Sequence, residues 1–208
     1  MLAPPAQPGA VGPRLGRAAP KGHDRSVDDL TRLALDAGAG DQAALARLVR
    51  STQAEVWRLC AHLVDVRAAD DLAQETYLRA VGALPRFRGD SSARTWLLVI
   101  ARRTCADEVR RRVRRRRLEG RIEQEARAAR SEGGDTSSAS VVDDLVAALE
   151  PDRRAAFVLT QLLGLSYAEA AQVCDCKVGT IRSRVSRARG DLMAMLDTEG
   201  TAGEVRPA

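Results

Sequence analysis

Apolar residues recur at helical spacing along most of this chain, from about Val27 to Leu196. Turn-forming residues separate the helical stretches, and no stretch shows a convincing strand pattern. Hydrophobic residues make up 45% of the 208 positions, but aromatic residues make up only 3%. Strands favour β-branched and aromatic side chains, whereas alanine and leucine favour helices. The sequence therefore predicts an all-α fold with an aliphatic, alanine-rich core.

The predicted helices fall into two groups. The first group is expected at roughly residues 26–37, 41–63, 70–84 and 93–117. Its third helix ends before Pro85, because the residue before a proline disfavours the helical conformation. Helical spacing then returns between Val141 and Leu196.

The segment between these groups has few large apolar residues and ends in a stretch rich in Gly, Ser and Thr. It carries five acids against three arginines from Glu119 to Asp135. This composition is typical of a linker. The predicted organisation is a disordered arm (1–24), a helical domain (25–117), a flexible acidic linker (118–140), a second helical domain (141–197) and a flexible tail (198–208).

The second group has the layout of a helix-turn-helix. Ser166 is followed three residues later by Glu169, which is a capping box and marks the start of a helix. The turn is expected at residues 175–177. The helix after the turn is expected to bury one stripe of side chains: Val178, Ile181, Val185 and Ala188.

The residues outside that stripe are basic or short and polar: Lys177, Thr180, Arg182, Ser183, Arg184, Ser186, Arg187 and Arg189. A helix of this kind fits the DNA major groove, where arginine can make a bidentate contact with guanine. The alternative is a basic face exposed only to solvent. The lack of acids and the capped preceding helix favour DNA binding.

The helix that begins at Asp70 carries a second candidate surface. Four residues at i, i+3, i+4 and i+7 share its outward side: Asp71, Gln74, Glu75 and Leu78. An acidic and polar face with an exposed leucine suits a basic protein partner. A solvated helix face is the alternative.

The next helix is strongly cationic. Between residues 102 and 117 there are nine arginines against Asp107 and Glu108, and Trp96 and Phe87 lie at its approach. Such a helix suits a nucleic-acid backbone together with unstacked bases. A solvated arginine-rich face is the alternative, although nine like charges repel unless an anion neutralises them.

Composition limits the function classes. A net charge of +5 and an isoelectric point near 9.5 fit a nucleic-acid partner. No GxGxxG, P-loop or HExxH motif occurs, so neither an enzyme, a cofactor nor a metal is expected. The N-terminal stretch has no apolar run long enough for a signal peptide or a membrane span.

The four cysteines are too scattered for a disulfide framework, which indicates a reducing, cytoplasmic setting. They are predicted to be small buried thiols. A redox role for Cys174 and Cys176 is the alternative, but their i, i+2 spacing suits a relaxed disulfide poorly.

Two long stretches carry a family resemblance. "DDLAQETYLRAVGALPRFRGDSSARTWLLVIARRTCADEVRR" and "LGLSYAEAAQVCDCKVGTIRSRVSRARGDL" closely resemble bacterial RNA polymerase sigma factors of the extracytoplasmic-function class, group IV, in particular the mycobacterial sigma-C type. The likeness covers nearly everything from Val27 to Leu196. Both motifs occur in the family's order and at its separation.

The resemblance implies partners for each surface. The helix at Asp70 would dock on the β′ clamp helices of core RNA polymerase, and the second domain would meet the β flap. The loop at 87–92 and the helix after it would read the promoter −10 element, with one base flipped into a pocket. The residues implied there are Phe87, Arg88, Asp90, Ser91, Trp96, Arg102, Arg103 and Arg110.

The helix-turn-helix would read the −35 element as duplex DNA. Base contacts would fall to Arg182, Ser183, Ser186 and Arg187. Phosphate contacts would fall to Lys177, Thr180, Arg184 and Arg189. Many relatives have proline at the position of Lys177, so the turn is expected to be looser here.

The acidic linker would thread the polymerase active-site cleft and RNA exit path, and a plain tether is the alternative. No autoinhibitory domain of the housekeeping type is recognisable, so an anti-sigma factor is a further candidate partner. The predicted function is a non-catalytic subunit that binds core polymerase and directs promoter recognition and melting. The alternatives are a stand-alone helix-turn-helix regulator and an RNA-binding protein that uses the arginines at 110–117.

Overall fold

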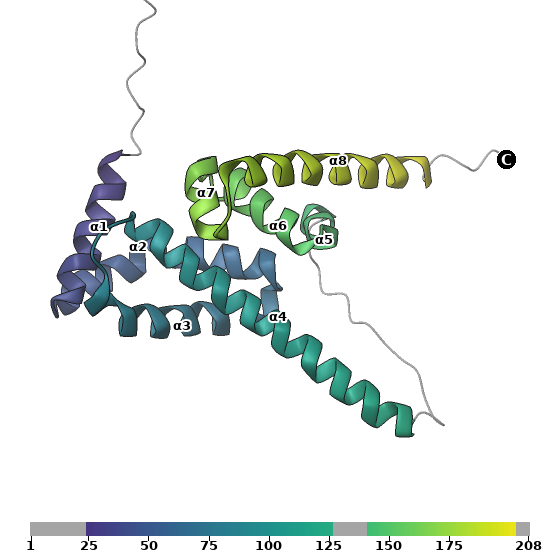
Figure 1. Cartoon of the computed structure of the whole chain (residues 1–208), viewed down its shortest axis with the longest axis horizontal. Coiled ribbons are helices and arrows are strands. Elements are labelled where there is room, and N and C mark those ends of the chain that lie inside the picture. The colour runs from purple at the N-terminus through teal and green to yellow at the C-terminus, as the bar shows by residue number, and fades with distance from the viewer. Residues whose placement is uncertain (1–23, 127–140, 203–208) are drawn as a thin grey trace, which may run out of the picture.

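A computed structural model describes residues 24–126 and 141–202, with side chains at 29–117 and 144–197. Its helical elements are α1 (Asp24–Gly38), α2 (Gln42–Leu63), α3 (Val66–Ala83), the 3-10 turn η1 (Leu84–Arg86), α4 (Ala93–Ala126), α5 (Val141–Ala148), α6 (Pro151–Phe157), the π turn η2 (Val158–Leu162), α7 (Tyr167–Cys174) and α8 (Val178–Ala202) (Figure 1). These ranges contain no strand, so the predicted all-α class is confirmed.

Several predicted segments lie outside the described residues. They are the N-terminal arm up to residue 23, residues 127–140 of the linker and residues 203–208 of the tail. The first part of the predicted linker is described, and its backbone is helical: α4 continues to Ala126, nine residues past the predicted end at Arg117. Glu, Gln, Arg and Ala in this extension are good helix formers.

Aspartate caps fix the starts of α2 and α3. Asp41 accepts hydrogen bonds from the backbone N–H groups of Ala43 and Ala44, at 2.8 and 3.0 Å, close to the predicted start. Asp65 accepts from the N–H of Ala68 at 2.8 Å. Helix α3 therefore begins at Val66, and the predicted start at Asp70 is wrong. The sequence reading missed this cap because Ala68 stands where a capping box would have Glu.

Helices α1 to α4 form the first domain, in which α2 packs against all three others. The core includes Val56 and Leu59 from α2 together with Leu97 and Leu98 from α4. On α3, Leu72, Thr76 and Ala80 are buried, and Ala73 is partly buried.

Helices α5 to α8 form the second domain, which contains the predicted helix-turn-helix. Both hydrogen bonds of the Ser166–Glu169 capping box are present. Asp175 makes the turn with a left-handed φ of 52°. On α8 the apolar stripe is buried as predicted, except that Val178, the first residue of the helix, is 40% exposed.

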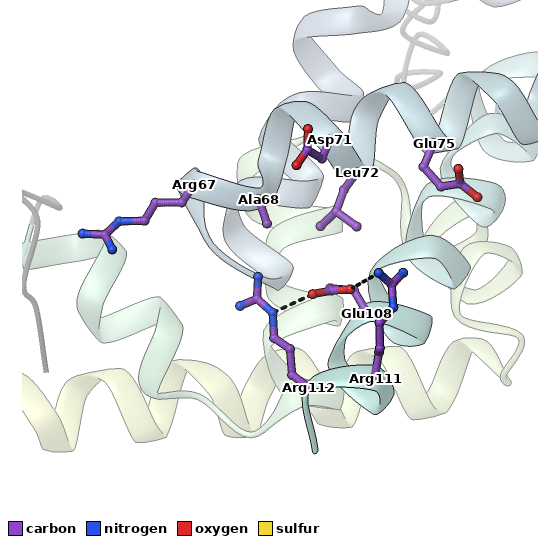
Figure 2. A pocket seen from close by; sticks show the side chains of 8 residues that line it. All are labelled: Arg67, Ala68, Asp71, Leu72, Glu75, Glu108, Arg111 and Arg112. Carbon is purple, nitrogen blue, oxygen red and sulfur yellow. Dashed lines mark hydrogen bonds and ion pairs between the residues drawn. The ribbon is translucent and has the colours of Figure 1, made fainter. Parts of the chain in front are cut away.

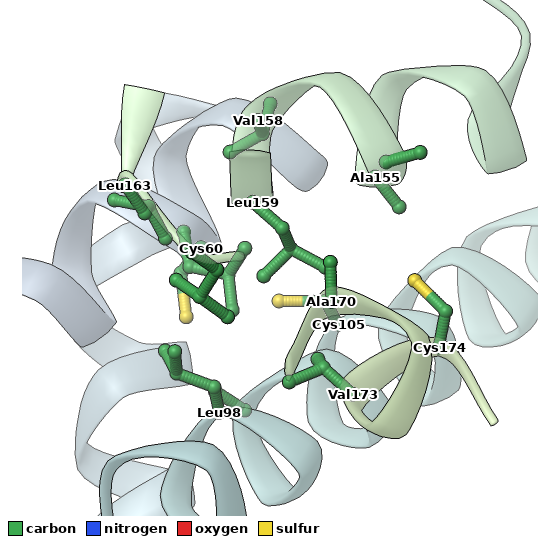
Figure 3. Packing of buried hydrophobic residues seen from close by; sticks show 14 of the residues in the cluster. Cys60, Leu98, Cys105, Ala155, Val158, Leu159, Leu163, Ala170, Val173 and Cys174 are labelled. Carbon is green, nitrogen blue, oxygen red and sulfur yellow. The ribbon is translucent and has the colours of Figure 1, made fainter. Parts of the chain in front are cut away.

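The two domains pack directly against one another. Helix α7 contacts α4, and residues of both domains belong to one continuous apolar cluster. Figure 3 shows Leu98 from α4 in this cluster with Leu159, Leu163 and Val173 from the second domain. The sequence does not predict this interface, because each of its apolar side chains could equally well be buried in the core of its own domain.

Candidate nucleic-acid interface

The outer face of α8 is basic and open to solvent. The exposed residues among those predicted to contact DNA are Lys177, Arg182, Ser183, Ser186, Arg187 and Arg189, whereas Thr180 is half-buried. Ser183 donates its hydroxyl to the carbonyl of Thr180 at 2.9 Å. Arg189 Nη2 donates to Gln161 Oε1 at 2.7 Å, and this bond crosses from α8 to η2. The face therefore presents a row of donors on a helix held by its buried stripe.

Arg184 was predicted to lie on this exposed face, but the structure places it elsewhere. Its side chain is 23% exposed and pairs with Asp152 at the start of α6. Its Nη1 also lies 3.8 Å from the sulfur of Cys176. Arg184 follows Ile181 by three residues and precedes Val185, so it sits at the edge of the buried stripe. Its helical position turns it toward α6.

The second candidate interface is the loop that joins η1 to α4. The ring of Phe87 contacts that of Trp96, with centroids 4.9 Å apart and an interplanar angle of 43°. Both rings are half-buried and pack against an apolar cluster that includes Leu84 and Ala93. In the same loop, Arg88 and Asp90 are exposed and Ser91 is half-buried. The loop thus contains the four residues predicted at the base pocket, Phe87, Arg88, Asp90 and Ser91, and Trp96 packs against the first of them.

The predicted DNA-binding arginines of α4 point in two directions. Arg103 and Arg110 are exposed, and their seven-residue spacing puts them on one helix face. Arg102 is 25% exposed and faces the second domain, with its Nη2 4.0 Å from a carboxylate oxygen of Asp152. Asp152 therefore contacts one predicted DNA-binding arginine from each domain.

The four residues predicted to form a docking face are exposed or half-buried on α3. Asp71 and Gln74 are exposed, and Leu78 is 70% exposed. Glu75 accepts a hydrogen bond from Arg79 Nε at 2.7 Å. Sequence reasoning missed Val81, which is 44% exposed and extends the apolar part of this face at i+3 from Leu78.

A charged groove of about 560 Å³ runs between α3 and α4 beside this docking face. Figure 2 shows Asp71 and Glu75 on α3 across from Glu108, Arg111 and Arg112 of α4. Glu108 holds both arginines, with Arg112 Nε at 2.8 Å and Arg111 Nη1 at 3.3 Å. The groove presents both signs of charge, which suits a partner with mixed charge.

Acids on α3 and α4 are held by arginines. Hydrogen bonds from Arg79 and Arg110 lower the pKa of Asp107. Burial alone would raise the pKa of Asp65, but its hydrogen bonds from Arg112 and from the N–H of Ala68 outweigh burial and lower it. These pairs neutralise part of the positive charge of α4 within the protein.

The thiols are mostly buried, as predicted: Cys60, Cys105 and Cys174 are buried and Cys176 is half-buried. Burial raises the pKa of Cys174 to about 11. Among the residues with described positions, no three His, Cys, Asp or Glu side chains gather where a metal ion could be held. Within the same residues, no helix has the length and apolar character needed to cross a bilayer.

Two family models match the chain, one in each domain. Residues 48–115 match the model described as sigma-70 region 2, and residues 140–192 match the model described as sigma-70, region 4. The first match spans α3 and the loop of residues 87–92, and the second spans the helix-turn-helix.

Two curated sigma factors resemble most of the chain. The chain is 49% identical over 179 residues to the ECF RNA polymerase sigma factor SigC of Mycobacterium tuberculosis, covering 84% of this chain and 95% of the relative. It is 36% identical to the ECF RNA polymerase sigma-E factor of Escherichia coli, covering 72% of this chain and 85% of the relative. The chain belongs to the extracytoplasmic-function class of sigma-70-type sigma factors, a family of non-catalytic transcription factors.

Solved structures agree with this assignment. CnrH in complex with the cytosolic domain of CnrY matches with a TM-score of 0.63 and 26% identity, over 82% of this chain and 99% of CnrH. The sigma factor RpoE from Bartonella quintana, in complex with the anti-sigma factor NepR, matches with a TM-score of 0.59 and 28% identity, over 73% of this chain and 96% of RpoE.

Proposed function

We propose that this sigma factor joins core RNA polymerase through the outer face of α3 and directs it to promoters by reading DNA at two separate sites. The observation that carries this proposal is that the protein has two such surfaces. One is the exposed basic face of α8, which follows the capped helix α7, and the other is the loop before α4, where the rings of Phe87 and Trp96 are in contact. One surface suits duplex DNA and the other suits an unstacked base.

Helix α8 is the proposed reader of the −35 element. Arg182, Ser183, Ser186 and Arg187 would contact bases, since all four are exposed. Lys177, Thr180, Arg184 and Arg189 would hold phosphates. Because Arg184 is paired with Asp152 in this structure, its contact with DNA requires that pair to open.

The loop of residues 87–92 is the proposed pocket for a flipped −10 base. Arg88 and Asp90 are exposed in this loop, Ser91 is half-buried, and the neighbouring ring of Phe87 contacts that of Trp96. Flipping a base costs a few kcal/mol, which contacts in the pocket would offset. Arg102, Arg103 and Arg110 would follow the backbone of the separated strand, which would help to keep the promoter melted.

The proposed role is that of a cytoplasmic specificity subunit with no catalytic activity of its own. The α3 residues Asp71, Gln74, Glu75 and Leu78 would meet the β′ clamp helices, and the second domain would meet the β flap. Residues 118–140 would pass through the active-site cleft. An anti-sigma factor is a proposed inhibitor, because RpoE of Bartonella quintana was solved in complex with one.

Reconstitution tests this function directly. The full chain is mixed with core RNA polymerase under reducing conditions, and co-elution and promoter-dependent transcripts are measured. We expect both, and we expect Gln74→Ala combined with Leu78→Ala to weaken co-elution while −35 duplex binding is retained. Gln53→Ala, at an exposed position on α2, is the control. Tight, specific duplex binding by a chain that never joins core enzyme would favour a stand-alone regulator instead.

A further inference from the structure

Helix α1 forms a small apolar core behind the −10 loop. Ala34, Leu48, Leu84 and Ala93 are buried together there, and Phe87 and Trp96 pack against them. The end of α1 also lies very close to η1, since a Cβ added to Gly38 would meet the carbonyl oxygen of Leu84 at 2.6 Å. The family model for region 2 begins at residue 48, so α1 lies before the matched segment.

One side chain of α1 reaches the start of α4. The backbone N–H of Ala93, the first residue of α4, donates to Thr31 Oγ1 at 3.1 Å. The first N–H groups of a helix have no partner within the helix. Ser92 Oγ accepts from the N–H of Thr95 at 3.1 Å. Ser92 and Thr31 therefore cap two different N–H groups at the start of α4. Because Ala93 is only 1% exposed, water is a poor substitute for Thr31.

The same side chain lies near the loop at Gly89. Gly89 has a left-handed φ of 76°. A Cβ built there would lie 3.7 Å from the methyl carbon of Thr31 and 3.9 Å from Leu35 Cδ1. Thr31 and Leu35 are one helical turn apart, so they form a single ledge under the loop. Thr31 therefore binds the end of the loop at Ala93, and its methyl group lies near Gly89 on the other side of Asp90 and Ser91.

We propose that Thr31 is a positioning residue for promoter recognition, which sets the shape of the loop that takes the flipped −10 base. This inference rests on the function proposed above. The hydroxyl of Thr31 acts through the N–H of Ala93 and its methyl group acts through Gly89, and neither needs to touch DNA. Base preference at the −10 element thus depends on a helix outside the matched region.

The test is transcription by core RNA polymerase with the full chain on a promoter library randomised at the −10 and −35 elements. Thr31→Val keeps the shape of the side chain and removes the acceptor. It should reduce the ratio of transcription between the preferred base and the other bases by about fivefold or more at one or two −10 positions, which is the effect expected for one lost hydrogen bond. The preference at the −35 element should not change. Thr31→Ser keeps the acceptor and should restore most of the preference.

Thr76→Val is the matched control, because Thr76 is buried in α3 and donates its hydroxyl to the carbonyl of Leu72. It should lower stability without changing the −10 profile. Leu35→Ala tests the ledge independently if Thr31→Val folds poorly, and it should alter the same positions. A wild-type −10 profile in both Thr31→Val and Leu35→Ala overturns the inference. A wild-type chain without promoter-dependent transcripts overturns the proposed function as well.

Discussion

Arg94 and Leu163 link the two domains: Nη2 of Arg94, in α4, donates to the carbonyl of Leu163 at 2.6 Å. The same guanidinium donates to both carboxylate oxygens of Glu55 on α2. The side chains of Arg94 and Glu55 are only 13% and 17% exposed. These hydrogen bonds lie within the apolar contact between the two domains, and they fix how the domains are oriented relative to one another.

Removing the guanidinium of Arg94 should destabilise the protein. Arg94→Met keeps an apolar stem but leaves the Glu55 carboxylate without its cation. Breaking a fully buried pair in this way costs about 3–5 kcal/mol, and we expect a smaller loss here because the pair is partly exposed. Arg94→Met with Glu55→Gln should recover much of the loss. Denaturant unfolding measures both. Arg32→Met, which breaks an exposed pair with Asp29, should cost under about 1 kcal/mol. Equal losses for Arg94→Met and Arg32→Met would contradict the role of Arg94.

Asp152 should compete with DNA for two arginines. It pairs with Arg184 and lies 4.0 Å from Arg102 in the structure. Asp152→Asn should release both guanidiniums and tighten binding of the isolated chain to promoter DNA by several-fold, measured by fluorescence anisotropy at fixed salt. Asp144→Asn is the control, since Asp144 is an exposed acid of the same domain and the net charge changes equally. Equal tightening by both variants would mean that only net charge matters.

The sequence predicts local features of this protein well and long-range contacts poorly. The Ser166–Glu169 capping box and the Ile181–Val185 stripe follow from residues within two turns of one another. The bond from Ala93 to Thr31 joins positions 62 residues apart. Such contacts depend on how whole helices pack, which periodicity does not encode. The sequence therefore predicts which residues lie in the loop and, apart from Arg184, on the exposed face of α8. It does not predict the Asp152 contacts, the Thr31 cap or the packing of the two domains against each other.

Acid should weaken the protein through Asp65. Its pKa is lowered in the folded state, so its contribution is present above the unfolded value of about 3.9 and is lost as the pH falls through the folded value. Asn caps a helix about as well as Asp, so Asp65→Asn keeps the cap on α3 and removes the charged pair with Arg112.

The measurement for Asp65 is the free energy of unfolding against pH. We expect Asp65→Asn to be less stable than wild type above about pH 5, with the difference shrinking as the pH falls through the lowered folded-state pKa and the wild-type carboxylate is protonated. Asp71→Asn, at an exposed carboxylate on the same helix, controls for the change in charge. A difference that stays constant over the whole range would show that the pair with Arg112 contributes nothing.

Arg187 and Arg189 should separate base reading from phosphate binding on α8. Both are exposed, but Arg189 is also held by Gln161 at the side of the helix. Arg187→Ala should cost about 1–3 kcal/mol on the preferred −35 duplex and relax preference at one position. Arg189→Ala should weaken all duplexes equally and reduce the slope of log affinity against log salt by about one. Competition binding against a set of single-base variants measures both effects. Uniform weakening by Arg187→Ala would assign it to phosphate and move base recognition to Arg182 and its neighbours.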